Sequence, residues 1–236
     1  MKAVFLDFAT MGPDLDLSPL TDLLPDLKLF DVTPDDQIAE RIKDVEFAFT
    51  NKIRLGDETL GNAGSLRFIG LTATGTDNVD LSIADKYDVA VCNIRAYCTQ
   101  SVVEHVFAVM LNFTHSIGRY AQAVRNGEWQ ESDSFCMLQY TIRELSAMTL
   151  GIVGHGELGR GVEEKARQFG MHVLIARRPG ARVKPDDGRT DLRDLLRQAD
   201  VVTLHCPLTD DTKNLIGKEQ LRLMKPNSIL INTARG

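Results

Sequence analysis

Residues 149–159 read TLGIVGHGELG, an apolar run that passes directly into a glycine-rich turn. A G-x-G-x-x-G pattern by itself is a weak indication of a dinucleotide site. This one follows a predicted strand, opens a predicted helix and precedes a second apolar run at residues 173–175. Gly154 would permit the tight turn, Gly156 the close approach of a pyrophosphate, and Gly159 the packing of the helix on the strand. The N–H groups and dipole of the helix N-terminus favour an anion.

A dinucleotide is the ligand that this strand–turn–helix unit predicts, and a glycine-rich turn that binds nothing is the alternative interpretation. The candidate cofactor-binding residues of the turn are Gly154, His155, Gly156, Glu157, Leu158 and Gly159.

The end of the next predicted strand indicates which dinucleotide is preferred. A site for NAD places an acid there, about 20 residues after the glycines, to bind the ribose 2′-OH. Here that position holds Arg177 followed by Arg178, and residues 172–180 contain no Asp or Glu. Two guanidinium groups suit a 2′-phosphate better than a neutral diol. The pair therefore favours NADP(H) over NAD(H), and a solvated surface pair is the alternative.

The flanking sequence repeats the alternation of strand and helix, which predicts an α/β protein with parallel sheets. In the second half, strands are expected at 149–153, 172–176, 200–204 and 228–232, and helices near 157–169, 191–198 and 217–224. This half is expected to be a Rossmann-type doubly wound sheet with strand order 3-2-1-4-5-6.

The first half has the same alternation without a glycine-rich loop. Its strands are expected at 3–6, 47–50, 66–71 and 89–92, with a helix at 34–43. One long helix, 99–125, is expected to join the halves and to end at Asn126-Gly127. The predicted domains are therefore residues 1–99 and residues 100–236, and the second carries the predicted NAD(P) site.

Composition narrows the class of protein further. The 236 residues are 43% hydrophobic and 25% charged, which excludes a disordered or collagen-like chain. The formal net charge of −6 argues against a nucleic-acid partner. No apolar run approaches the ~18 residues of a membrane span. The first residues lack a small-residue cleavage site, so no secretory signal is expected. The four cysteines are scattered, and the five histidines lack metal-ligand spacing. We expect a cytoplasmic protein that binds a small molecule and no metal.

Four further segments make the chain resemble the D-isomer-specific 2-hydroxyacid dehydrogenases. They are residues 72–80 (TATGTDNVD), 101–105 (SVVEH), 201–209 (VVTLHCPLT) with Thr212, and 224–236 (MKPNSILINTARG). Residues 135–159 are most similar to the glycerate dehydrogenase, or hydroxypyruvate reductase, branch. The resemblance implies a flavodoxin-like substrate domain beside the Rossmann domain, and a homodimer built on the long helix. It also implies hydride transfer from NAD(P)H to hydroxypyruvate or glyoxylate.

The resemblance assigns roles to individual residues. Arg235 would hold the substrate carboxylate and polarise the carbonyl, a task that suits a planar, permanently charged guanidinium. Backbone N–H groups around Ala73, Thr74 and Gly75 would add to the carboxylate site. Cys206 and Pro207 would line the cofactor pocket by shape. The remaining cofactor-binding residues implied are Thr212 and Thr233. His105 and His205 are interpreted as packed or hydrogen-bonded structural histidines.

The resemblance also implies a proton-donating histidine and its glutamate partner downstream of Arg235, where this sequence stops. We therefore expect a fragment whose Rossmann sheet is cut after its fourth strand, with residues 229–231 as an apolar edge. Such a chain is expected to show no measurable reductase activity. A non-catalytic dinucleotide-binding protein, like the corepressor relatives of this family, is the alternative function.

Overall fold

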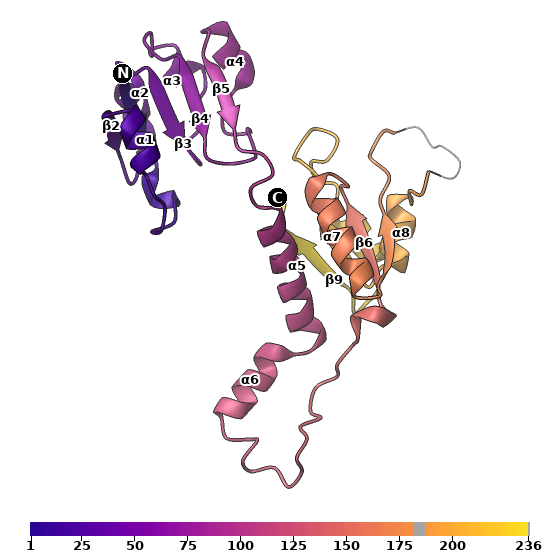
Figure 1. The fold of residues 1–236 in the computed structure, drawn as a ribbon. Helices are drawn as coiled ribbons and strands as arrows, with labels where there is room; N and C mark the ends of the chain where they lie inside the picture. Colours follow the sequence, from indigo (N-terminus) through magenta and orange to yellow (C-terminus); the bar gives the residue numbers. More distant parts are fainter. Residues whose placement is uncertain (182–186, 236) are drawn as a thin grey trace. The chain divides into compact units, whose positions relative to one another are not determined.

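A computed structural model describes residues 1–181 and 187–235. The chain divides into two compact units, Met1–Tyr97 and Cys98–Gly236, and each has its own parallel sheet (Figure 1). None of the helices in the described part of the chain is long and apolar enough to span a membrane.

The first unit is a five-stranded parallel sheet with the order β2-β1-β3-β4-β5, which is the flavodoxin-like order that the resemblance implied. Its strands are β1 (Lys2–Phe5), β2 (Asp26–Leu29), β3 (Phe47–Thr50), β4 (Phe68–Leu71) and β5 (Ala90–Asn93). Its helices are η1 (Phe8–Thr10), α1 (Ser18–Leu23), α2 (Asp35–Ile42), α3 (Asp57–Leu60) and α4 (Leu81–Lys86). Four strands were predicted, and β2 was not, because it reads DLKL and is mostly exposed.

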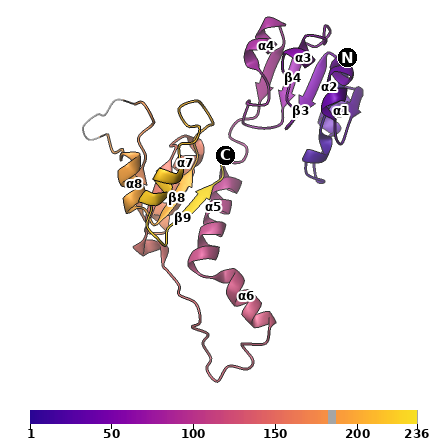
Figure 2. The same ribbon diagram turned by 180° about the vertical axis from the view of Figure 1, so that it is seen from behind.

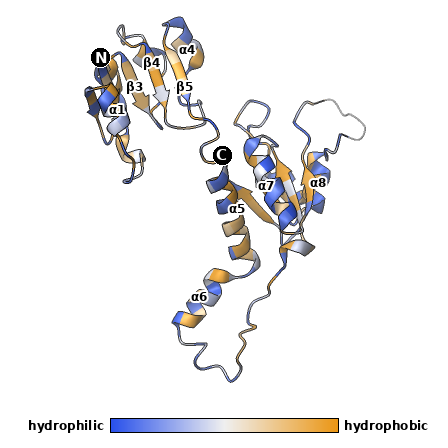
Figure 3. Ribbon diagram, in the orientation of Figure 1, coloured by the Kyte–Doolittle hydropathy of each residue, from blue (hydrophilic) through white to orange (hydrophobic). Residues whose placement is uncertain are grey.

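The core of this unit lies on one face of its sheet. Val4, Ala48 and Ile69 come from three adjacent strands and pack with Ile38 and Ile42 of α2. All five are almost completely buried. The strands of this unit are mostly hydrophobic, whereas its helices mix hydrophilic and hydrophobic residues (Figure 3). Burial of one helix face against the sheet therefore organises this unit.

The prediction of one continuous helix over residues 99–125 is wrong. The structure has α5 (Thr99–Thr114) and α6 (Ile117–Arg125), separated by Ser116 in the left-handed region at φ 52°. The hydroxyl of Thr114 donates to the carbonyl of Met110 at 2.9 Å, a local bond that competes with the helix. The predicted end is confirmed: Asn126 caps α6, and Gly127 follows at φ +86°.

The second unit has the four strands and three helices predicted for it. The strands are β6 (Thr149–Val153), β7 (His172–Ile175), β8 (Val201–Leu204) and β9 (Ile229–Asn232). The helices after α6 are η2 (Leu145–Ala147), α7 (Glu157–Gln168), α8 (Leu192–Gln198) and α9 (Lys218–Leu223). Figure 2 shows β8 and β9 from behind.

The order of these strands corrects the prediction. The observed order is β7-β6-β8-β9, so the third strand lies beside the first and not outside the second. Among the described residues, Thr190 pairs with Ala176 at the end of β7 through a bridge. The sequences of residues 177–181 and 187–189 contain charged residues, Pro and Gly but no apolar run, so they predict no strand beside β7. The sequence 229–231 does form an edge strand, with Leu230 38% exposed.

Helices cover both faces of this sheet. Leu150 and Ile152 of β6 pack with α5 and α7 through residues such as Val106 and Val162. On the other face, Leu195 of α8 packs so closely that a Cβ at Gly151 would lie 2.4 Å from its Cδ2 atom. Packing on both faces leaves the carboxyl ends of β6 and β8 as the open edge of the unit, where ligands bind in open α/β sheets.

Candidate cofactor site

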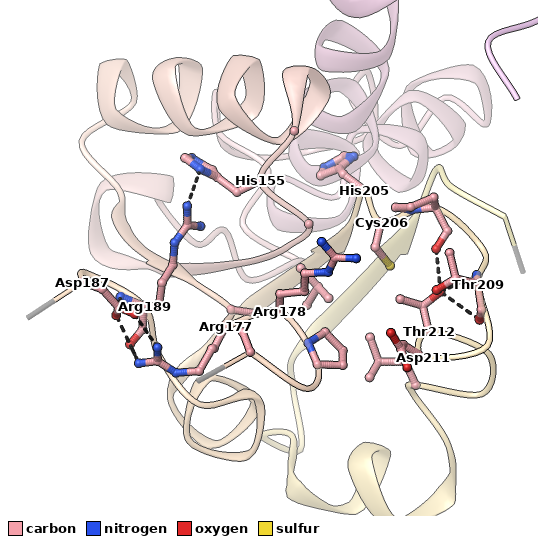
Figure 4. A pocket seen from close by; sticks show the side chains of 18 residues that line it. His155, Arg177, Arg178, Asp187, Arg189, His205, Cys206, Thr209, Asp211 and Thr212 are labelled. Atoms are coloured by element: carbon pink, nitrogen blue, oxygen red, sulfur yellow. Dashed lines mark hydrogen bonds and ion pairs between the residues drawn. The ribbon is translucent and has the colours of Figure 1, made fainter. Parts of the chain in front are cut away.

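A pocket of about 690 Å³ lies at the carboxyl ends of β6, β7 and β8, within the second unit (Figure 4). It is the place where the glycine turn predicts a dinucleotide. The residues that were predicted from the sequence and line it are Gly154, His155, Gly156, Arg177, Arg178, Cys206, Pro207 and Thr212.

The three glycines of the turn meet different surroundings. Gly154 has φ +95°, and a Cβ there would lie 2.5 Å from the backbone nitrogen of Cys206. A Cβ at Gly159 would lie 2.1 Å from the carbonyl oxygen of Gly154. At Gly156, the N-cap of α7, a Cβ would have nothing within 4 Å. The chain itself therefore requires glycine at two positions. Gly156 leaves open space at a helix N-terminus, which fits an approaching pyrophosphate.

The rest of the predicted turn does not line the pocket. Glu157 lies in the first turn of α7, and its carboxylate accepts a hydrogen bond from the hydroxyl of Thr99 on α5. Leu158 is half-buried and Gly159 is buried in that turn. Glu157, Leu158 and Gly159 therefore belong to the first turn of α7 and not to the pocket wall.

His155 links the glycine turn to α7 and to the loop after β7. Its Nε2 atom lies 2.5 Å from Oε2 of Glu163, and its Nδ1 atom lies 3.1 Å from Nη2 of Arg189. Burial raises the pKa of Glu163. Hydrogen bonds from Arg167 and His155 outweigh burial, so the pKa is held below its usual value. Glu163 is therefore ionised at neutral pH.

The two arginines at the end of β7 have different surroundings. Arg177 forms a two-pronged ion pair with Asp187, and its Nη2 atom also donates to the carbonyl of Arg189 at 3.2 Å. The hydrogen bonds from Arg177 hold the pKa of Asp187 below its usual range. Arg178 is exposed and extends into the pocket, and within residues 1–181 and 187–235 it forms no ion pair (Figure 4).

The loop after β8 forms the facing wall. Burial raises the pKa of the Cys206 thiol, so this group is a poor nucleophile and contributes shape. The hydroxyl of Thr212 donates to the carbonyl of Pro207 at 2.6 Å and accepts from the backbone nitrogen of Thr209 at 2.8 Å. Thr212 thus lies in the pocket wall with its hydroxyl bonded within its own loop.

His205 is buried at the end of β8. Its Nε2 atom lies 2.9 Å from the Thr203 hydroxyl, and its Nδ1 atom lies 3.4 Å from the hydroxyl of Thr233. Burial lowers the pKa of His205 to about 4, so the ring is neutral at physiological pH. Thr233 contacts this histidine and does not line the pocket. His105 was expected to be packed or hydrogen-bonded, but it is exposed on α5.

The residues expected to bind substrate lie outside this pocket. Arg235 follows β9 and is exposed, while Gly236 of the same motif lies outside the described residues. Ala73, Thr74 and Gly75 follow β4 in the first unit. The amide of Asn93 donates to the carbonyl of Thr74 at 2.7 Å. The N–H groups of Thr74 and Gly75 have no hydrogen-bond partner in the described parts of the chain.

Sequence reasoning missed several residues of the pocket wall, above all Asp187 and Arg189. They lie beyond a stretch without periodicity, and no motif marks them. Their positions follow from the bridge between Ala176 and Thr190. Among the described residues, no group of His, Cys, Asp or Glu side chains has the arrangement of a metal site.

Comparisons with known proteins give three consistent likenesses. Residues 107–236 match the family model described as D-isomer specific 2-hydroxyacid dehydrogenase, NAD binding domain. The chain is 45% identical over 204 residues to a glycerate dehydrogenase of Methylorubrum extorquens, an alignment that covers 86% of this chain and 63% of that enzyme. It is 33% identical over 242 residues to a hydroxypyruvate reductase of Blautia hydrogenotrophica, covering 100% of this chain and 75% of the relative.

A solved structure agrees with these likenesses. An acyclic imino acid reductase in complex with NADPH and D-Arg superposes with a TM-score of 0.85 and 26% identity. The superposition covers 100% of this chain and 75% of that one. The chain thus spans 63% of the glycerate dehydrogenase and 75% of each of the other two proteins.

Proposed function

Because this chain belongs to the D-isomer-specific 2-hydroxyacid dehydrogenases, we propose that its protein reduces a small 2-oxo acid, hydroxypyruvate or glyoxylate, with NAD(P)H. The observation that carries the proposal is the pocket at the glycine turn, with open space at Gly156 and a helix N-terminus beside it. The products would be D-glycerate or glycolate. The nicotinamide ring would supply a hydride to the carbonyl carbon of the substrate.

In this proposal the second unit holds the cofactor. The backbone at Gly154 and Gly156 and the N-terminus of α7 bind the pyrophosphate. Cys206 and Pro207 shape the opposite wall of the pocket. Arginines gather at the end of β7, where the ribose 2′-substituent is recognised, and this supports NADPH as the preferred cofactor.

The substrate carboxylate is assigned to Arg235. A guanidinium binds a carboxylate with two parallel hydrogen bonds and stabilises negative charge that develops on the carbonyl oxygen during reduction. A carboxylate-binding role is also proposed for Thr74 and Gly75, whose N–H groups have no other partner in the described chain.

Neither His205 nor His105 is proposed as the proton donor. His205 is buried, bonded to Thr203 and Thr233, and neutral near pH 7, so it is not the imidazolium acid that would protonate a substrate. His105 is exposed on α5 and does not line the pocket. We expect residues 1–236 alone to bind cofactor without measurable turnover, as the motif comparison indicated.

We further propose a homodimer in the cytoplasm. The segment around α6 carries large apolar side chains that are exposed in one protomer, including Trp129, Phe135 and Leu138. Exposed apolar surface of this kind is typical of a protein interface. The four cysteines all lie in the described residues and are free thiols, in keeping with a reducing compartment.

The test of the proposed function is Arg235→Lys, made in the product of the complete open reading frame. A point charge cannot reproduce the planar fork, so kcat/KM for hydroxypyruvate should fall about 10²-fold. The affinity for NAD(P)H should not change, because the pyrophosphate site is elsewhere. The control is Arg222→Lys on the exposed side of α9, which should leave both quantities unchanged.

Two results would count against the proposal. Normal reduction by Arg235→Lys would remove Arg235 from the substrate site. Tight binding of NAD(P)H by the complete protein with no turnover of any 2-oxo acid would favour a non-catalytic dinucleotide-binding protein.

A further inference from the structure

The segment Asp187–Thr190 is fixed against the end of β7 by several contacts. Thr190 bridges Ala176, and the backbone nitrogen of Arg177 donates to the carbonyl of Thr190 at 2.8 Å. Asp187 binds the Arg177 guanidinium and accepts from the backbone nitrogen of Arg189 at 3.0 Å. These contacts place Arg189 at the strand end where a dinucleotide's ribose 2′-position is recognised.

The charge of Arg177 is already compensated. Both oxygens of Asp187 accept from its two terminal nitrogens, and the side chains of the pair are only 16% and 24% exposed. A phosphate that bound Arg177 would have to displace a carboxylate held by two hydrogen bonds. Arg177 is therefore suited to hold the segment in place rather than to bind an anion.

The surroundings of Arg189 differ from those of Arg177. A guanidinium can only donate hydrogen bonds, so its contact at 3.1 Å requires Nδ1 of His155 to be an acceptor without a proton. The proton of the neutral ring is then on Nε2, which donates to Glu163. His155 thus holds Arg189 without neutralising it, and Glu163 is in turn held by Arg167 at 2.7 Å.

Arg178 completes the arrangement. It lines the same pocket, and neither its guanidinium nor that of Arg189 has a carboxylate at ion-pair distance within residues 1–181 and 187–235. Figure 4 shows the three arginines pointing to different partners: Arg177 towards Asp187, Arg189 towards His155, and Arg178 into the pocket. Within residues 1–181 and 187–235, Arg178 and Arg189 thus border one pocket beside the glycine turn without a carboxylate at ion-pair distance, and Asp187 acts on Arg189 only through the longer-range attraction of their charges.

We propose that Arg178 and Arg189 bind the 2′-phosphate of NADPH, and that Arg177 and His155 are positioning residues for Arg189. This inference rests on the proposed function, because it needs a dinucleotide in the pocket. It replaces the adjacent pair Arg177 and Arg178, which the sequence alone indicated, by a pair that is far apart in sequence. The rival assignment is that Asp187 accepts the 2′-OH of NADH.

The test measures binding and needs no turnover. Kd values for NADPH and NADH are determined by fluorescence titration. Those for adenosine 2′,5′-bisphosphate and adenosine 5′-monophosphate are determined by calorimetry. Arg178→Gln and Arg189→Gln should each weaken NADPH and the bisphosphate about 10- to 100-fold, the range of a charge-assisted hydrogen bond. NADH and the monophosphate should change less than about twofold. Arg193→Gln, on the exposed side of α8, is the matched control.

The positioning role of His155 has its own readout. His155→Asn keeps an acceptor near the Nδ1 position, and it should retain the preference for NADPH. His155→Leu removes the acceptor and should reduce the ratio of the two dinucleotide affinities severalfold. An equal loss of both affinities in His155→Leu would mean that the histidine supports the glycine turn only.

Other outcomes would contradict the assignment of Arg178 and Arg189 to the 2′-phosphate but leave the proposed reductase function standing. Such outcomes are equal wild-type affinities for NADPH and NADH, an Arg189→Gln variant with unchanged NADPH affinity, or a loss confined to Arg177→Gln. Weaker NADH binding by Asp187→Asn would establish the rival assignment. Failure of the wild-type protein to bind either dinucleotide would instead contradict the proposed function itself.

Discussion

At the scale of single residues, the glycine turn separates what the chain requires from what a ligand requires. Gly154 and Gly159 are enforced by backbone atoms of the chain, at 2.5 Å and 2.1 Å from a hypothetical Cβ. Gly156 has no such neighbour. A side chain at Gly156 would therefore meet only what binds there, and this difference can be measured.

Two alanine variants make the comparison. Gly159→Ala should lower the free energy of unfolding by about 1–3 kcal/mol, because the new methyl group collides with a backbone carbonyl that cannot move aside. Gly156→Ala should leave the unfolding free energy within about 0.5 kcal/mol and weaken dinucleotide binding. Urea denaturation and fluorescence titration of both variants check this. A stable Gly159→Ala or a tightly binding Gly156→Ala would contradict the assignment.

His205 gives the protein a defined dependence of stability on pH. Burial lowers its pKa to about 4 in the folded state, while the unfolded chain has the ordinary value of 6.5. The unfolded state therefore binds the proton first as the pH falls. The contribution of neutral His205 to the free energy of unfolding is fully present above pH 6.5. As the pH falls to about 4, the free energy of unfolding decreases by about 3 kcal/mol through this residue.

The check is urea denaturation of the wild type and His205→Gln from pH 7 to pH 4. The wild type should lose about 3 kcal/mol more than the variant over this range, since the carboxylates titrate in both. Parallel curves would show that His205 is not buried in its neutral form. His115→Gln, a half-buried histidine after α5, serves as the comparison.

At the scale of elements, the break between α5 and α6 depends on one strained residue. Ser116 is left-handed, and its side chain makes no capping bond to α6. The carbonyl of Asn112's side chain accepts from the backbone nitrogen of Gly118 at 3.1 Å and fixes the start of α6. The break therefore belongs to the fold, and Ser116 bears its conformational strain.

Ser116→Gly should raise the free energy of unfolding by about 0.5–1 kcal/mol, because glycine adopts positive φ without a steric penalty. Ser101→Gly, in the regular first turn of α5, should lower it by about 0.5 kcal/mol. Urea denaturation of the two variants gives opposite signs if the break is as described. A destabilised Ser116→Gly would indicate a continuous helix.

Elements with strong local patterns were predictable, and elements set by long-range packing were not. The spacing of apolar residues and the positions of the glycines were enough to predict β6, α7 and the buried strand β8. The strand β2 was missed, since DLKL shows no apolar alternation and gains its place only by pairing with β1. The bridge at Thr190 likewise depends on its partner Ala176.

The candidate site divides in the same way. The glycine turn was predicted from its motif spacing, and Cys206 and Pro207 were predicted from the family resemblance. Gly154 to Gly156, Cys206 and Pro207 all line one pocket. The ion pair between Arg177 and Asp187 could not, because a ten-residue separation without periodicity gives no distance. Of the two adjacent arginines, Arg177 is paired with Asp187, whereas Arg178 forms no ion pair within residues 1–181 and 187–235.

At the scale of the whole molecule, the exposed apolar side chains near α6 predict the oligomeric state. Phe135 and Leu138 are 89% and 84% exposed, an unusual state for such residues in a monomer. The double variant Phe135→Glu and Leu138→Glu should convert a dimer into a monomer, measured by sedimentation. Leu23→Glu, an exposed residue of α1, is the control. A wild-type monomer would contradict the prediction.

All five strands of the first sheet lie within residues 2–93, and the second sheet begins only at Thr149. On the ribosome, translation proceeds at about 5–20 residues per second, so roughly 3–11 s separate the synthesis of β5 from that of β6. The first sheet is therefore fully synthesised before any strand of the second exists. Its parallel pairings form without competition from the cofactor-binding sequence, and the order of the two units along the chain is also an order in time.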